Sequence, residues 1–210
     1  MEVEAIRIAL GLGDFHLFGS SWGGLLAIEY AATRPHGLRS VTLSSPVVSV
    51  PVWCRDAESL KKALPREVQE VIAYHESQGY FDCPEYTSAV LEFWKRHVCR
   101  ISPWPQELEA SFAGFGVSPY REMWGPSEFT QTGNLKGHDA TSRLSDIHAP
   151  TLWTCGRYDE ARPDSTEHFH SLMQDSQFVV FEESSHMAHI EEQMAYLATL
   201  REFLGSVDGR

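Results

Sequence analysis

Basic residues and long apolar runs are both scarce in this sequence. Lys and Arg number 17 against 29 Asp and Glu in 210 residues, which gives a net charge of −12. Nucleic-acid binding requires a basic face, so this balance argues against a nucleic-acid partner. A membrane-spanning helix needs about 20 consecutive apolar residues, and no stretch approaches that length. We therefore expect neither a nucleic-acid nor a membrane partner.

Cysteine is also rare, and its four copies follow no ligand pattern. They show no C-x-x-C spacing and no matching pair of histidines, so the sequence predicts no metal site. Reduced thiols of this kind are typical of the cytosol. The first residues, Met1 to Glu4, contain no basic segment of the kind that opens a signal peptide. We expect a cytoplasmic protein. The cysteines are Cys54, Cys83, Cys99 and Cys155.

The most informative motif is a G-x-S-x-G pentapeptide at residues 19–23. It lies between an apolar run at Phe15–Phe18 and an apolar helical run that starts at Leu25. A strand-to-helix junction of this kind is what a nucleophile elbow requires. The central Ser21 would be the nucleophile, with Gly19 and Gly23 allowing strand and helix to pack closely around it. A plain Ser/Gly turn is the alternative, and the flanking pattern favours the elbow.

Periodicity divides the chain into three blocks. Residues 1–46 and 141–210 alternate strands with helices, which predicts a mostly parallel, doubly wound sheet. The expected strands are 15–18, 38–43, 150–155 and 177–181, and the expected last helix is 188–204, with Met194 and Leu197 on its apolar stripe. Residues 47–140 lack clear strands, and helices are expected after Pro65 and Pro84. We interpret this middle block as a helical cap inserted into the core.

Ligands of such sheets bind at the carboxyl ends of the strands. Asp159 follows the strand at 150–155, and His186 follows the strand at 177–181. The order serine, acid, histidine is that of α/β-hydrolases. An imidazole can take the proton of a serine hydroxyl near neutral pH, and a buried carboxylate can orient that imidazole. The sequence therefore predicts Ser21, Asp159 and His186 as a catalytic triad.

Each partner of Ser21 has a rival nearby. Asp164 competes with Asp159, but it falls in the first turn of the next helix, where a carboxylate simply favours the helix dipole. His189 competes with His186, but it is expected on a helix rather than in the loop that can reach across the strand ends.

Three segments resemble the proline iminopeptidase (prolyl aminopeptidase) family of α/β-hydrolases, which includes the tricorn-interacting aminopeptidases. A fourth segment is similar to a motif at the end of that family's cap. The resemblance implies release of an N-terminal residue, often proline, from short peptides with a free N-terminus, through an acyl-enzyme and without any metal or organic cofactor. Relatives also include amino-acid amidases and esterases, so these activities stay open. The segments are Gly19–Gly24, Gly156–Glu160, Ser184–His189 and Gly125–Thr130.

The resemblance also assigns two further carboxylates. Glu128 and Glu160 match positions that hold the free amino group of the substrate. A carboxylate beside the nucleophile would recognise a cationic N-terminus through charge-assisted hydrogen bonds and reject the interior of a chain. Without the resemblance, Glu160 could equally be a solvated loop charge, and Glu128 would be read as a helix-end or surface acid.

The sequence departs from the family pattern before the elbow. Family members have several strands there, whereas only one helix is expected here, so the first strands are missing and the chain resembles an N-terminally truncated form. The H-G-G-type loop that donates one oxyanion N–H is absent, which leaves the backbone N–H of Trp22. We expect Phe15 and Leu17 to be exposed on a bare sheet edge. A catalytically silent binding module is therefore a further alternative, and the oligomeric state stays open.

Overall fold

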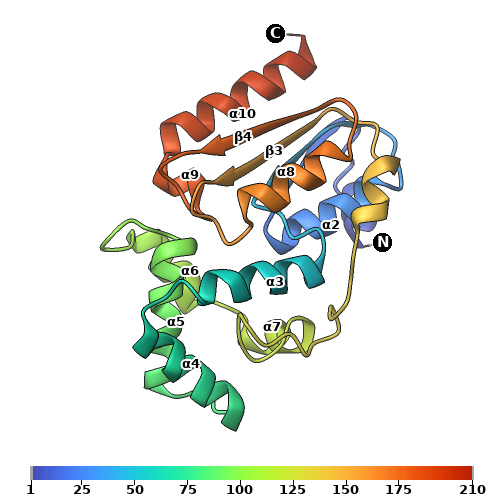
Figure 1. The fold of residues 1–210 in the computed structure, drawn as a ribbon. Helices are drawn as coiled ribbons and strands as arrows, with labels where there is room; N and C mark the ends of the chain where they lie inside the picture. Colours follow the sequence, from blue (N-terminus) through green and yellow to red (C-terminus); the bar gives the residue numbers. More distant parts are fainter. Residues whose placement is uncertain (1, 210) are drawn as a thin grey trace.

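The computed structural model describes residues 2–209 and contains one four-stranded parallel sheet (Figure 1). Its strands lie in chain order, and each neighbouring pair is parallel. All four predicted strands are confirmed. They are β1 (Phe15–Ser20), β2 (Leu38–Ser44), β3 (Thr151–Gly156) and β4 (Ser176–Phe181).

Helices cover both faces of the sheet. Helices α2 (Trp22–Ala31) and α8 (Pro163–Ser171) pack on one face, and α10 (Gln193–Asp208) packs on the other (Figure 1). Helix α1 (Glu2–Ala9) precedes β1, as predicted, and a 3-10 helix (Thr141–Asp146) precedes β3. This two-sided cover is what buries a parallel sheet and makes its strands apolar.

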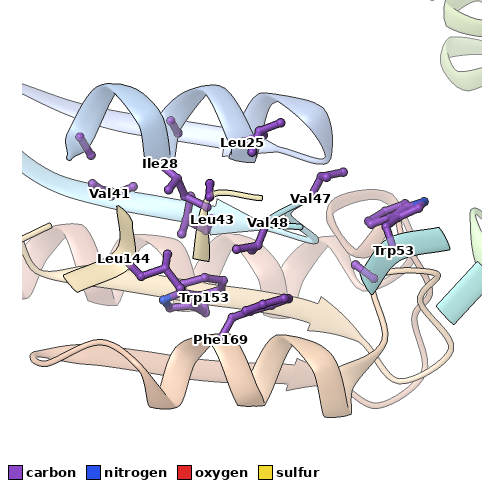
Figure 2. Packing of buried hydrophobic residues seen from close by; sticks show 14 of the residues in the cluster. Leu25, Ile28, Val41, Leu43, Val47, Val48, Trp53, Leu144, Trp153 and Phe169 are labelled. Atoms are coloured by element: carbon purple, nitrogen blue, oxygen red, sulfur yellow. The ribbon is translucent and has the colours of Figure 1, made fainter. Parts of the chain in front are cut away.

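The main core lies between the sheet and the helices α2 and α8, which cover one of its faces. Val41, Leu43 and Trp153 of the central strands meet Ile28 of α2 and Phe169 of α8 there (Figure 2). Successive strand residues point to opposite faces. The alternate residues of β2 are therefore directed toward the α10 face, where the Tyr196 hydroxyl donates to Ser44 Oγ at 2.9 Å.

The middle block is helical, as predicted, and part of it joins the main core. Val50, Trp53 and Ala57 of the first helix belong to the main cluster, whereas the next two helices enclose a cluster of their own. That first helix was not predicted from the sequence, although Val50, Trp53, Ala57 and Leu60 follow a helical spacing. The helices are α3 (Val50–Lys61), α4 (Arg66–Gln78), α5 (Pro84–His97), α6 (Gln106–Ala113) and α7 (Val117–Met123).

The last predicted helix is two helices, α9 (Ala188–Glu191) and α10. The backbone leaves the helical region at Glu192, with φ −123° and ψ 49°, and the Glu192 carboxylate turns back to accept hydrogen bonds from the preceding loop. Because of this break, the buried face of α10 is not the one expected for a single continuous helix. Met194 is 77% exposed, while Tyr196 and Phe203 are buried, so the predicted apolar stripe through Met194 is wrong.

Strand β1 lies at the edge of the sheet, and within residues 2–209 only β2 pairs with it. The expectation that Phe15 and Leu17 are exposed is wrong. Phe15 stacks on Tyr30 with ring centroids 6.2 Å apart, and Leu17 packs against the main core. The exposed apolar residue of this strand is Phe18, at 51%. Within residues 2–209, no helix has the length and apolar character needed to cross a membrane.

Candidate active site

Ser21 lies between the end of β1 and the first residue of α2, in a backbone conformation that non-glycine residues rarely adopt. Its φ is 53° and its ψ is −124°. Its N–H donates to the carbonyl of Ser44 at 3.0 Å, and its carbonyl accepts from the N–H groups of Gly24 and Val47. Strained residues persist only where the surroundings hold them, and they cluster at functional sites. The geometry is that of the predicted sharp turn.

Gly19 and Gly23 differ in how much space a side chain would have at their positions. A Cβ on Gly19 would lie 2.4 Å from the carbonyl oxygen of Gly23 and 2.7 Å from the Ala27 side chain. A Cβ on Gly23 would meet nothing within 4 Å. Close packing of β1 against α2 therefore requires glycine at position 19. The sequence expectation for Gly23 is wrong, because only its backbone takes part in the contact.

Asp159 and His186 are brought together from two different loops. His186 Nδ1 lies 2.8 Å from Asp159 Oδ1, and both side chains are almost completely buried. An ionised carboxylate accepts only, so Nδ1 carries the proton in this pair. The lone pair of neutral imidazole is then on Nε2, where it could accept a proton from another group.

The Asp159 carboxylate is fully satisfied by four donors. Besides His186, Oδ1 accepts from the N–H of Ala161 at 2.8 Å. Oδ2 accepts from the Ser45 hydroxyl at 2.6 Å and from the N–H of Gly156 at 3.2 Å. Sequence reasoning missed Ser45. Its position directly after a predicted strand could have indicated it, because the other site residues also lie at the carboxyl ends of strands.

The electrostatic environment favours the protonated form of His186. Burial alone lowers the pKa of an imidazole, but the charge and hydrogen bond of Asp159 outweigh it, and the pKa of His186 is raised. The carboxylates of Glu128 and Glu191 act in the same direction. The ring of Trp53 stands edge-on to the imidazole, with centroids 5.9 Å apart.

No hydrogen bond joins Ser21 Oγ to His186 in the part of the chain that the structure describes. The two residues are linked instead through the end of β2. Ser21 donates its N–H to the carbonyl of Ser44, and the next residue, Ser45, donates its hydroxyl to Asp159. Trp22 is the first residue of α2, so its N–H has no acceptor within the helix.

Glu160 is a buried acid that pairs with no Lys or Arg among residues 2–209. It is 5% exposed, its Oε2 has no hydrogen-bond partner, and its Oε1 lies 3.9 Å from His186 Nδ1. Burial raises the pKa of Glu160 well above its usual value, and the charges of Glu128 and Asp159 raise it further. The second predicted acid, Glu128, is half-buried and accepts one hydrogen bond, from Trp53 Nε1 at 3.4 Å.

Burial also raises the pKa of Glu128, against the hydrogen bond from Trp53 and the charge of His186. Glu128 and His186 are close enough for each charge to shift the pKa of the other group, and Glu160 lies beside the same imidazole. Neither forms an ion pair with Lys or Arg within residues 2–209. An uncompensated buried carboxylate is costly, and no Lys or Arg among residues 2–209 offsets that cost for either acid.

The two rival residues lie elsewhere. The Asp164 side chain is 79% exposed, in the first turn of α8, and pairs with Arg162. His189 is on α9, where its ring packs against Tyr196 with centroids 5.9 Å apart. Among residues 2–209, no group of three or more His, Cys, Asp or Glu side chains is arranged to hold a metal ion.

Comparison with known proteins identifies relatives of the whole chain. The family model for the alpha/beta hydrolase fold matches residues 2–193. The proline iminopeptidase of Heyndrickxia coagulans is 45% identical over 207 residues, which are 98% of this chain and 72% of that protein. The proline iminopeptidase of Saccharolobus solfataricus is 38% identical over 208 residues, 98% of this chain and 67% of that protein.

Solved structures agree with the sequence relatives. The crystal structure of VinJ superposes with a TM-score of 0.94 at 38% identity, covering 98% of this chain and 71% of that one. Proline iminopeptidase of Mycobacterium smegmatis superposes with a TM-score of 0.89 at 36% identity, covering 99% of this chain and 70% of that one. The chain therefore belongs to the α/β-hydrolase fold and, within it, to the proline iminopeptidase family of hydrolytic enzymes.

Proposed function

We propose that this protein is a serine aminopeptidase that releases an N-terminal residue, preferably proline, from short peptides. Ser21 attacks the scissile carbonyl and forms an acyl-enzyme. His186 takes the proton of Ser21 and gives it to the leaving amine, and Asp159 orients the imidazole. The N–H of Trp22 donates to the developing oxyanion.

One observation carries the choice of a free N-terminus. The Oε2 atom of Glu160 is buried without a partner, beside His186 and within electrostatic reach of Glu128. A substrate ammonium would donate to both carboxylates and remove the cost of burying them unpaired. An acylated N-terminus has no positive charge and would leave the two acids uncompensated.

The geometry of Asp159 and His186 supports the acid–base part of the proposal. The buried hydrogen bond between them fixes the ring so that Nε2 is the basic nitrogen. The Ser45 hydroxyl and two backbone N–H groups hold the carboxylate in turn. The imidazole therefore has little rotational freedom, which is the condition for efficient proton transfer to and from a serine.

The test compares two substrate classes. Proline-β-naphthylamide carries the free secondary ammonium, and its N-acetylated form or a simple p-nitrophenyl ester does not. We expect Glu160→Gln and Glu128→Gln to lower kcat/KM for the free amine about 10- to 100-fold, the size of a lost charge-assisted hydrogen bond of about 1.5–3 kcal/mol. Turnover of the blocked substrates should change little. Asp164→Asn, an exposed acid on the following helix, is the matched control.

The alternatives have distinct outcomes in this assay. Equal losses on both substrate classes would assign the two acids a structural role and favour an amidase or esterase on the same residues. Absence of any turnover that depends on Ser21, measured against Ser21→Ala, would favour a binding module without catalytic activity.

A further inference from the structure

The end of α5 and the residues that follow it in the cap, His97 to Arg100, contact both loops of the candidate active site; we call them the cap segment. The carbonyl of His97 accepts hydrogen bonds from the N–H of Glu160 at 3.3 Å and from the N–H of His186 at 3.2 Å. The carbonyl of Val98 accepts from the N–H of Met187 at 3.0 Å. The last carbonyls of a helix have no partner inside it. Here the site loops supply those partners, so the end of α5 and the site are physically joined.

One side chain strengthens this junction. The Glu191 carboxylate accepts from the N–H of Arg100 at 2.8 Å through Oε1, and from the N–H of Ser185 at 2.8 Å through Oε2. The Ser185 hydroxyl also contacts both oxygens, at 3.1 and 2.9 Å. Ser185 is fully buried and directly precedes His186. Glu191 therefore joins the cap segment to the residue next to the imidazole.

Glu192, the next residue, also accepts hydrogen bonds from the loop before α9, but it makes none with the cap segment within residues 2–209. The Glu192 carboxylate accepts from the N–H of Glu183 at 3.0 Å and from the Ser184 hydroxyl at 2.6 Å. Both contacts are to the same β4–α9 loop, one to two residues further from His186. The chain thus contains a matched pair of carboxylates, of which only Glu191 bridges cap and loop.

We propose that Glu191 is a positioning residue, which sets the position of His186 relative to the cap by holding Ser185 and Arg100 together. The proposal rests on the proposed function, in which His186 is the general base. The cap carries Glu128, so the same clamp fixes the distance between the acid that would bind the amine and the imidazole that would act on the scissile bond. Displacements of about 1 Å in such a constellation can cost about a hundredfold in rate.

The charge of Glu191 gives a second, independent signature. Its carboxylate contributes to raising the pKa of His186, whereas the Glu192 carboxylate contacts residues of the loop that are further from the imidazole. Removing the charge at position 191 should therefore lower the pKa of His186 and move the acid limb of the activity profile to lower pH. The substitution leaves the other titratable groups around His186 unchanged, namely Asp159, Glu160, Glu128 and His189.

Kinetics of Glu191→Ala, Glu191→Gln and Glu192→Gln test the proposal on proline-β-naphthylamide. We expect kcat to fall about 100-fold for Glu191→Ala, with KM changed less than about twofold, because the reacting geometry is displaced rather than the ammonium site. Glu191→Gln should recover part of kcat, since its one carbonyl oxygen can replace one of two acceptors. Its acid limb should move to lower pH, whereas that of Glu192→Gln should not.

A readout without turnover separates this proposal from the proposed function. The imidazole resonances of His186, titrated by NMR, report its pKa in the wild type and in each variant. A pKa of His186 lowered by Glu191→Gln but not by Glu192→Gln supports the clamp, even if the wild type shows no Ser21-dependent turnover and the proposed function fails. An unchanged pKa in Glu191→Gln, or equal effects of the two Gln variants, would overturn the proposal.

Discussion

The Ser45 hydroxyl donates a hydrogen bond of 2.6 Å to Oδ2 of Asp159, the oxygen opposite the one that faces His186. Ser45 is fully buried, and its φ of 48° lies in the left-handed region, which a non-glycine residue rarely adopts. It follows β2 directly, as Asp159 and His186 follow the next two strands. The end of β2 therefore contributes to the site through the carboxylate rather than through the imidazole.

We expect Ser45→Ala to lower kcat about tenfold, because Asp159 loses one of its four donors and holds His186 less firmly. The loss of a hydrogen bond to a charged group corresponds to about 1.5–3 kcal/mol, shared between stability and rate. Steady-state kinetics and urea unfolding measure the two parts. Ser40→Ala, within β2 and similarly buried but bonded to His16, should affect stability without changing kcat. The same decrease in kcat for both variants would contradict a specific role for Ser45.

Replacing Glu160 should stabilise the protein while it impairs the proposed activity. In the unfolded chain a glutamate loses its proton near pH 4.3, whereas the pKa of Glu160 in the folded protein is raised. Above pH 4.3 the folded state thus binds more protons, and stability decreases as pH rises until the folded-state pKa is passed. We expect Glu160→Gln to raise the free energy of unfolding by about 1–3 kcal/mol at neutral pH, the cost of an unsatisfied buried group.

Urea unfolding at pH 5 and pH 8 checks this result. The gain from Glu160→Gln should be larger at pH 8 than at pH 5, and Glu167→Gln on the exposed side of α8 should show no gain at either pH. A destabilised Glu160→Gln would mean that an unrecognised partner compensates the carboxylate in the folded protein.

The raised pKa of His186 determines the acid side of the pH profile. The imidazole must be neutral to accept the serine proton, so activity is lost as pH falls through its pKa. Because the Asp159 carboxylate raises that pKa despite burial, the acid limb of kcat/KM should lie above pH 6.5, the ordinary histidine value. Asp159→Asn should lower kcat and shift the limb downward. A limb below pH 6 in the wild type would be inconsistent with this pair.

The two glycines of the elbow should respond differently to alanine. A methyl group at Gly19 would lie 2.4 Å from a backbone oxygen, whereas at Gly23 it would point into open space. We expect Gly19→Ala to destabilise the protein by about 1–3 kcal/mol, as overpacking does. Gly23→Ala should be neutral or stabilising by up to about 1 kcal/mol, because Gly23 is within α2 and alanine favours a helix. Chemical denaturation of both variants provides the comparison.

Local patterns were enough to predict the sheet and the meeting of two site residues. Each strand is a short apolar run between turn residues, and each of Asp159 and His186 follows such a run, so their neighbourhood follows from parallel topology alone. The sharp turn at Ser21 could be predicted because an apolar strand precedes it and an apolar helix follows it. These features depend on residues close together in the sequence.

The missed features depend on which side chains and backbone groups meet in the folded chain. Helix α3 packs on the main core through Val50, Trp53 and Ala57, which are buried, and through Val52 and Cys54, which are partly buried, and these contacts are with segments far away in the sequence. At the break, the Glu192 carboxylate accepts hydrogen bonds from loop residues eight to nine positions earlier. No periodicity in a single sequence reveals which distant backbone groups a side chain will satisfy, so the break between α9 and α10 was not foreseen.

Labelling by a fluorophosphonate probe tests the central claim most directly, since such a probe bonds covalently to an activated serine. Mass spectrometry of the digested protein should find the adduct on Ser21 and on no other serine, and Ser21→Ala should abolish it. His186→Ala should slow labelling of Ser21 strongly, because the hydroxyl is a poor nucleophile without its base. Labelling that persists in Ser21→Ala, or a Ser21 that never reacts in the folded wild type, would contradict the claim that Ser21 is the nucleophile.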